Sequence, residues 1–123
     1  MICLDANYLI LGLVPTSLES REIIAWTMAG EVLVTPMTAW YEFLCGPVTP
    51  PQIAAMRAFL SDILPFEEPQ AATAAQLFNA AGRKRSLRMD AMIAGAAVTV
   101  GAVLATNNKK DFAPLEPYGL RLV

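Results

Sequence analysis

The sequence predicts an α/β fold in which a central parallel sheet of four or five short strands is flanked by helices on both sides. Short apolar runs of strand length alternate along the chain with longer segments that have helical spacing. The strand-like runs are apolar throughout, which is typical of strands at the centre of a sheet. The 123 residues suit one domain by size, so we expect residues 1–123 to fold as a single unit.

The first elements are a strand and two helices. Residues 1–4 are apolar and end at an acid, which predicts a central strand, and residues 7–14 continue as a short helix. The next helix is capped by Ser17 or Ser20 and ends at Gly30. We expect its buried side to consist of Ile23, Ile24 and residues 26–28.

A second buried strand is predicted at residues 32–34. Thr35 and Pro36 then suit the N-cap and first position of a helix. That helix ends at Gly46, which Pro47 follows. The spacing predicts a buried stripe of Met37, Trp40, Tyr41 and Leu44.

The middle of the chain is mostly helical by its pattern. Residues 52–64 have apolar positions at helical spacing, and residues 65–67 are short enough for one very short strand. Residues 69–86 are predicted to form an Ala-rich helix with a basic end.

The C-terminal part returns to the sheet. Residues 90–100 have small side chains on all sides, as a central packed helix needs, and a turn at Gly101 leads to a strand at 103–105. Residues 106–112 form the loop after this strand, and residues 120–123 suit an edge strand. The uncharged stretch 91–105 is 15 residues long, which is below the roughly 20 residues that span a bilayer.

Four carboxylates lie on these apolar elements or at their ends: Asp5, Glu42, Asp90 and Asp111. A carboxylate taken out of water must be paired, protonated or bound to a metal. The chain has nine Lys and Arg and no His, so a hard cation such as Mg²⁺ or Mn²⁺ is the simplest charge partner if the acids meet. Asp5 and Asp111 follow predicted strands, and the carboxyl ends of parallel strands share one edge of a sheet.

Each acid also has an ordinary structural interpretation. Asp5 suits a helix cap, Glu42 a solvent-facing helix position, and Asp90 gains from the dipole of the helix it begins. Asp111 lies in a polar loop, where Thr106, Asn107 and Asn108 are common turn residues. The interpretation as a site therefore depends on the four acids as a set.

Basic residues cluster beside two of the acids, which suits a phosphate backbone passing over a metal centre. The alternative is a solvated helix end followed by a solvated turn. The cluster consists of Arg83, Lys84, Arg85, Arg88, Lys109 and Lys110. The two cysteines, Cys3 and Cys45, have no partner at zinc-ligand spacing, and we expect both to be buried reduced thiols.

The acidic segments resemble the PIN domain and, within it, the VapC-type toxins of toxin–antitoxin modules. The resemblance lies in LDANYLI, TAWYEFLCG, RMDAMIAGAA and TNNKKDF, in this order along the whole chain. It implies a Mg²⁺- or Mn²⁺-dependent endoribonuclease with Asp5, Glu42, Asp90 and Asp111 as the metal-binding acids. It also implies support from Asn7 and Thr106, an RNA substrate and a cognate antitoxin. Some relatives have an acid where this chain has Asn108, so here Asp111 is the fourth carboxylate.

Two rivals remain at this stage. One is a non-catalytic interaction protein in which the acids are structural caps. The other is a phosphatase with Asp5 as nucleophile, which is disfavoured because the usual second Asp is Asn7 here. Hydrophobic residues make up 55% of the chain, so we expect another chain, in a homodimer or a complex, to cover some apolar surface. The reduced thiols and the absence of a basic, apolar leader predict a cytoplasmic protein.

Overall fold

Four short strands form one parallel sheet in the order β3-β2-β1-β4. The computed structural model describes all 123 residues. The strands are β1 (Ile2–Leu4), β2 (Leu33–Pro36), β3 (Asp62–Leu64) and β4 (Val103–Ala105). This architecture confirms the predicted α/β fold with a central parallel sheet.

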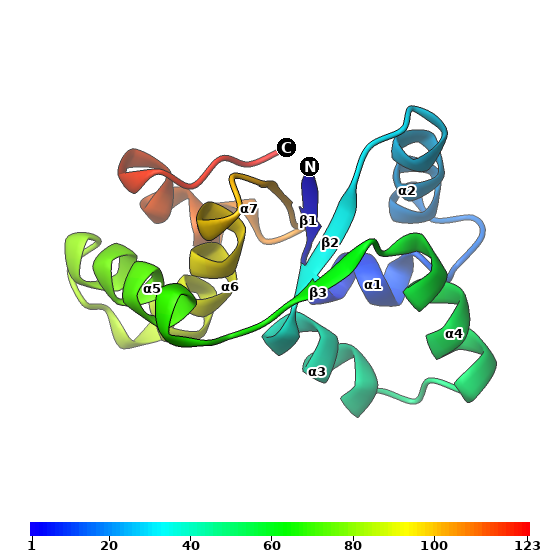
Figure 1. The fold of residues 1–123 in the computed structure, drawn as a ribbon, viewed down its shortest axis with the longest axis horizontal. Helices are drawn as coiled ribbons and strands as arrows, with labels where there is room; N and C mark the ends of the chain where they lie inside the picture. The colour runs from blue at the N-terminus through cyan, green and yellow to red at the C-terminus, as the bar shows by residue number, and fades with distance from the viewer.

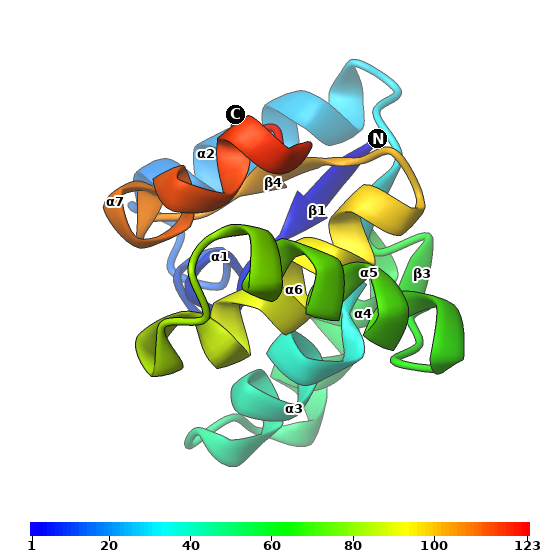
Figure 2. The same ribbon diagram turned by 90° about the vertical axis from the view of Figure 1, so that its left-hand side faces the viewer.

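Helices cover both faces of the sheet. The helices are α1 (Ala6–Leu11), α2 (Leu18–Met28), α3 (Met37–Cys45), α4 (Pro50–Phe59), α5 (Glu68–Ala80), α6 (Arg88–Thr99) and α7 (Lys109–Phe112), with the 3₁₀ helices η1 (Arg85–Leu87) and η2 (Ala113–Tyr118). Figures 1 and 2 show α5 and α6 together on one side of the strands and α1, α2 and α4 on the other. No helix combines the length and the apolar character that crossing a bilayer requires.

Strand β1 separates two hydrophobic cores because successive side chains of a strand point to opposite faces. Ile2 and Leu4 pack with buried residues of α1 to α4, among them Phe43 and Met56. Cys3, between them in sequence, packs into the other core with residues of α5, α6 and η2. The strand is thus buried on both faces, as its uninterrupted apolar sequence predicts.

The register of the central strands determines which residues meet at their carboxyl ends. Leu4 of β1 is paired with Ala105 of β4, and the amide of Asp5 donates a hydrogen bond of 3.0 Å to the Ala105 carbonyl. The next residues, Asp5 and Thr106, therefore leave the sheet side by side.

Helix α6 lies close against α5 because one of its buried residues has no side chain. A Cβ atom built on Gly95 would lie 2.8 Å from three atoms of Ala74, which is closer than such atoms pack. Helix α5 then ends in a Schellman motif, in which Gly82 has φ +95° and the Arg83 amide donates to the Phe78 carbonyl at 3.0 Å. These contacts fix the helix that carries Asp90.

The predicted helix start at Thr35 and Pro36 is wrong. Both residues belong to β2, and the Thr35 hydroxyl donates a 2.7 Å hydrogen bond to the Leu4 carbonyl. Pro36 is tolerated at the end of the strand and precedes the first helical residue, Met37. The Thr-Pro pair matched a cap pattern, but tertiary pairing of the strand decides its conformation.

Of the predicted buried stripe of α3, only Trp40 is confirmed. Met37, Tyr41 and Leu44 are exposed, and the buried residues are Ala39, Trp40 and Phe43. Large apolar residues of α3 lie on more than one side of the helix, so two different sets of positions have helical spacing. The sequence alone does not determine which set is buried. On α2, Ile24 and Met28 are likewise exposed although both were expected to be buried.

Three boundaries in the middle of the chain differ from the prediction. The helix expected over 52–64 ends at Phe59, and β3 follows at Asp62–Leu64 instead of at 65–67. Apolar residues continue at helical spacing past Phe59, and no Gly or Pro marks the change. The helix expected over 69–86 ends at Ala80.

Smaller differences occur elsewhere. The expected edge strand at 120–123 is a single bridge between Leu104 and Leu122, and the loop 106–112 contains the short helix α7. Cys3 is buried as expected, whereas Cys45 is exposed near the end of α3.

Candidate active site

Asp5 is a buried carboxylate held by two donors. Only 4% of the residue is exposed, at the point where β1 ends and α1 begins. Oδ1 accepts a 2.8 Å hydrogen bond from the Ala6 amide, and Oδ2 accepts one of 2.7 Å from the Thr106 hydroxyl. Asp5 therefore caps α1, as the ordinary structural interpretation predicts, while its Oδ2 is fixed by a second element.

The loop after β4 is organised around Thr106. The residue is 1% exposed. Its hydroxyl donates a hydrogen bond to Asp5 and accepts one of 3.0 Å from the Asn108 amide. Asn107 donates from Nδ2 to Oε1 of Glu19 at 3.0 Å, which connects the loop to α2. Thr106 thus contacts Asp5 directly, Asn108 contributes only its backbone amide, and the side chain of Asn7 makes no hydrogen bond.

Asp90 lies in the first turn of α6 and is half-buried. Its pKa is raised above the usual carboxyl range, first by burial and then by the negative charges of Asp111, Asp5 and Glu42. Three acids from three other elements are therefore within electrostatic reach of this carboxylate. The structure brings the predicted quartet into one neighbourhood.

Glu42 and Asp111 form the outer part of this neighbourhood. Glu42 is largely exposed on α3, and its pKa is raised by partial burial and by the charge of Asp5. Asp111 is exposed on α7. Neither side chain has a hydrogen-bond donor in the structure, so both are free to turn toward a ligand.

The four carboxylates are the type of ligand that a hard cation prefers, although their side chains do not surround one common point. Carboxylate oxygens are the ligands that Mg²⁺ and Mn²⁺ prefer, and mutual repulsion among acids is relieved by a cation between them. No three Asp, Glu, Cys or His side chains lie close enough, as they stand, to hold a metal ion. Only Asp5 is held in place by hydrogen bonds.

No basic side chain neutralises the acids. The one salt bridge of the structure joins the N-terminal amine to Glu31 at 3.4 Å. The Arg88 guanidinium lies 5.8 Å from the centre of the Phe78 ring. The other five predicted RNA-binding residues, Arg83, Lys84, Arg85, Lys109 and Lys110, are exposed on the segments that precede Asp90 and Asp111.

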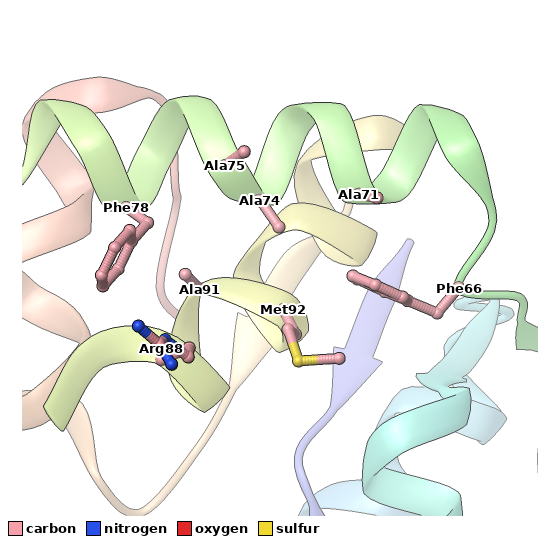
Figure 3. A pocket seen from close by; sticks show the side chains of 8 residues that line it. All are labelled: Phe66, Ala71, Ala74, Ala75, Phe78, Arg88, Ala91 and Met92. Atoms are coloured by element: carbon pink, nitrogen blue, oxygen red, sulfur yellow. The ribbon is translucent and has the colours of Figure 1, made fainter. Parts of the chain in front are cut away.

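None of the four acids lines the apolar pocket between α5 and α6. Figure 3 shows it between α5 and α6, with Phe66 and Phe78 toward its two ends and Met92 between them. Seven of its eight lining residues are hydrophobic, and Arg88 is the exception. A second pocket, between α5 and the C-terminal segment, also includes none of the four acids.

Two polar residues near the quartet were not predicted from the sequence. Glu19 of α2 accepts the hydrogen bond from Asn107, and no local pattern marks this contact because 88 residues separate the two. Thr38 of α3 has a hydroxyl that is shielded from solvent and has no hydrogen-bond partner. Thr38 lies one helical turn before Glu42, and this spacing can be read from the sequence.

The chain combines a parallel α/β sheet with four acids near the carboxyl edge of that sheet. The family model of the PIN domain matches residues 2–115, so the chain belongs to the PIN domain family. Proteins with this domain are generally nucleases. No curated protein sequence matches the chain closely enough to count as a relative.

Solved structures of low sequence identity share the fold. VapBC2 from Rickettsia felis, bound to a DNA fragment from their promoter, contains a chain with a TM-score of 0.79 and 17% identity, covering 100% of this chain and 98% of that one. DNA-bound VapBC from Salmonella typhimurium has a TM-score of 0.75 and 20% identity, covering 99% and 96%. A toxin–antitoxin complex from Klebsiella pneumoniae has a TM-score of 0.72 and 24% identity, covering 92% and 91%.

Proposed function

We propose that this chain is a Mg²⁺- or Mn²⁺-dependent endoribonuclease and the toxin of a VapBC-type toxin–antitoxin pair. The observation that carries the proposal is the environment of Asp90, whose pKa is raised first by burial and then by the charges of the three other acids of the quartet. Four carboxylates from separate elements at one edge of the sheet have no structural need to converge, because each costs free energy in the company of the others. Binding a divalent cation explains their convergence.

Within this proposal, Asp5 and Asp90 bind the cation directly, Asp111 is the next ligand, and Glu42 completes the set. A divalent cation held by these carboxylates would supply Lewis-acid polarisation of the scissile phosphate and of an attacking water. Thr106 holds Oδ2 of Asp5 in one orientation through its 2.7 Å hydrogen bond. Asn7, next to the Asp5–Ala6 turn, and Asn108, at the start of α7, are the supporting polar residues.

The RNA is bound by the basic residues at the rim of the acidic site. Arg83, Lys84 and Arg85 have no acidic partner, so their charges are available for phosphates without the breaking of an ion pair. Lys109 and Lys110 are equally exposed beside Asp111, and Arg88 begins the helix of Asp90. Single-stranded RNA suits an acidic slot with a basic rim, because its backbone can bend over the cation.

A protein partner is the second part of the proposal. Exposed hydrophobic side chains lie on α2 and on α3, and Met28 and Tyr41 are 84% and 67% exposed. Surface of this kind is commonly covered in an assembly. Structures with the same fold come from VapBC and other toxin–antitoxin complexes, which supports an antitoxin as the partner, and we propose a homodimer of this chain as a second way to cover this surface.

The decisive experiment is RNA cleavage by the purified chain with Mg²⁺, Mn²⁺ or EDTA. Asp5→Asn tests the site. Asp62→Asn is the matched control, because Asp62 is an exposed carboxylate on β3 outside the quartet. We expect cleavage by the wild type and by Asp62→Asn only with the cation, and no cleavage by Asp5→Asn. Thermal unfolding with Mn²⁺ is the second readout, and we expect stabilisation of the wild type.

The outcomes separate the proposal from its rival. If the folded wild type cuts no RNA in a broad panel and Mn²⁺ leaves its unfolding temperature unchanged, the acids are structural and the chain is an interaction module. Cleavage that persists in EDTA or in Asp5→Asn would remove the quartet from the reaction.

A further inference from the structure

The pocket between α5 and α6 is an apolar cavity with a single charged residue in its lining. Its volume is about 180 Å³, and Figure 3 shows Arg88 near the Phe78 end. The Arg88 guanidinium lies 5.8 Å from the centre of the Phe78 ring and has no acidic partner. Sites for small ligands usually measure about 300–1,000 Å³, whereas an apolar cavity of about 150 Å³ can hold a benzene ring. The size of this pocket therefore suits one aromatic side chain.

Helix α3 presents such a side chain to solvent. Trp40 and Phe43 pack into the core on one side of this helix. Tyr41 is 67% exposed and is the most exposed aromatic residue of the chain. Met37 and Leu44 are also exposed and lie on the same side as Tyr41, because they are four residues before it and three after it. The outer side of α3 is thus an apolar stripe with a projecting ring at its centre.

The stripe and the pocket lie on the same side of the molecule. Strands β2 and β3 pair in a register that places Pro36 opposite Leu64. Met37, the first residue of α3, follows Pro36, and Phe66, which lines the pocket, comes two residues after Leu64. Helix α3 also contacts α6, and Figure 2 shows α3 below α5 and α6 in the view onto this side. One surface of the chain therefore carries both a ring-sized cavity and a projecting ring.

The near absence of charge on this surface suits contact with a second copy of the chain. The only charged residue of α3 is Glu42, and the only one of α5 is Glu68 at its start. Two copies can therefore bring these helices together with little repulsion between like charges. Aromatic residues, Met and Arg are enriched at protein interfaces, and this surface is rich in them. Two-fold symmetry makes each contact occur twice, so the ring of each copy can enter the pocket of the other.

We propose that two copies of this chain pair across this surface, with Tyr41 of each copy filling the α5–α6 pocket of the other. The Arg88 guanidinium then lies beside the tyrosine ring, and a cation over an aromatic ring is favourable. The inference rests on the homodimer of the proposed function and adds to it the surface and the anchoring residue. It does not depend on RNA cleavage.

The test measures self-association of the full chain by sedimentation equilibrium in EDTA, without RNA. Tyr41→Ala removes the ring, and Ala75→Arg fills the pocket from an exposed position of its lining. Tyr118→Ala is the control for the first variant, because Tyr118 is an exposed tyrosine on η2, away from α3. Ala72→Arg is the control for the second, because Ala72 is exposed on α5 and lines neither pocket. The unfolding temperature of each variant establishes that it is folded.

We expect the wild type and both controls to form dimers of equal affinity. Tyr41→Ala and Ala75→Arg are each expected to weaken dimerisation by about 30-fold or more, as the loss of a central aromatic anchor implies.

Mixing the two weakened variants is the sharper experiment. A mixed pair keeps one complete contact, because the ring of the Ala75→Arg copy can enter the open pocket of the Tyr41→Ala copy. In each homodimer both contacts are lost. We therefore expect native mass spectrometry of the mixture to show the mixed dimer in excess of either homodimer.

A wild type that stays monomeric would overturn the inference and leave the pocket to a different chain. Dimers that tolerate both substitutions would also overturn it, as would a mixture without mixed dimers, because Tyr41 would then not enter this pocket. RNA cleavage is scored separately on the same wild-type protein. A dimer that passes these tests and cuts no RNA would refute the proposed nuclease and leave the inference intact.

Discussion

Replacing Thr106 by Val tests whether the acidic site is held together from within the fold. Valine has the shape of threonine, so the substitution removes the hydroxyl without opening a cavity. Two hydrogen bonds are lost, the 2.7 Å bond to Oδ2 of Asp5 and the 3.0 Å bond from the amide of Asn108. Both Thr106 and Asp5 are buried, so water does not replace the missing donor.

The expected cost follows from these two contacts. A hydrogen bond to a charged group contributes about 1.5–3 kcal/mol, so Thr106→Val is expected to lower the free energy of unfolding by about 2–3 kcal/mol. For a chain of 123 residues, each kcal/mol changes the unfolding temperature by about 4 °C. The unfolding temperature in EDTA is therefore expected to fall by about 8–12 °C.

Thr106→Ser is the control, because it keeps the hydroxyl and removes one buried methyl group, which costs about 1 kcal/mol. Urea unfolding monitored by tryptophan fluorescence gives both free energies, with EDTA present throughout. If Thr106→Val is as stable as Thr106→Ser, the hydroxyl does not stabilise the buried Asp5 carboxylate, and the argument for a prearranged ligand fails.

Three further predictions concern charge and packing. Asp90 has a raised pKa in the folded protein, so its contribution to stability is full below about pH 4 and is lost as the pH rises through its folded pKa. Asp90→Asn in EDTA is therefore expected to flatten the decline in unfolding temperature between about pH 4 and 7. An unchanged slope would contradict the electrostatic account. Gly95→Ala places a methyl group against Ala74 and is expected to cost about 1–3 kcal/mol in urea unfolding, whereas a neutral effect would mean that α5 and α6 separate freely. Arg85→Ala is expected to weaken RNA binding and to reduce the slope of log affinity against log salt by about 1, and a wild-type slope would exclude contact of Arg85 with phosphate.

The sequence predicted the parts of the fold that depend on local composition. The apolar runs at β1 and β4 have strand length and are followed by polar residues, so both strands were found at nearly their observed bounds. The small side chains of α6 predicted a helix packed on many sides, and Ala91 and residues 93–97 are buried. Ser17 was one of the two caps considered for α2, and its Oγ accepts the Ser20 amide at 3.0 Å.

Tertiary choices were the parts that the sequence did not predict. Helix α3 has large apolar residues on more than one side, so only packing decides that Phe43 is buried and Tyr41 exposed. Strand β3 continues the helical spacing of α4 without a Gly or Pro, and its pairing with β2 determines its conformation. The positions of the four candidate acids could be taken from the sequence. That hydrogen bonds hold only Asp5 among them could not.

That unequal support has a consequence for how the site is assembled. Asp5 receives two hydrogen bonds, whereas Glu42, Asp90 and Asp111 receive none, and the pKa values of Glu42 and Asp90 are raised by burial and by neighbouring charges of the same sign. Repulsion keeps unsupported carboxylates apart, which agrees with the absence of three acids close enough to hold a metal ion. We therefore expect a cation to meet Asp5 as a fixed ligand and to draw the other acids inward. Its binding would then relieve this repulsion, and the gain in stability on adding Mn²⁺ is expected to grow as the pH rises through the raised pKa values of Glu42 and Asp90.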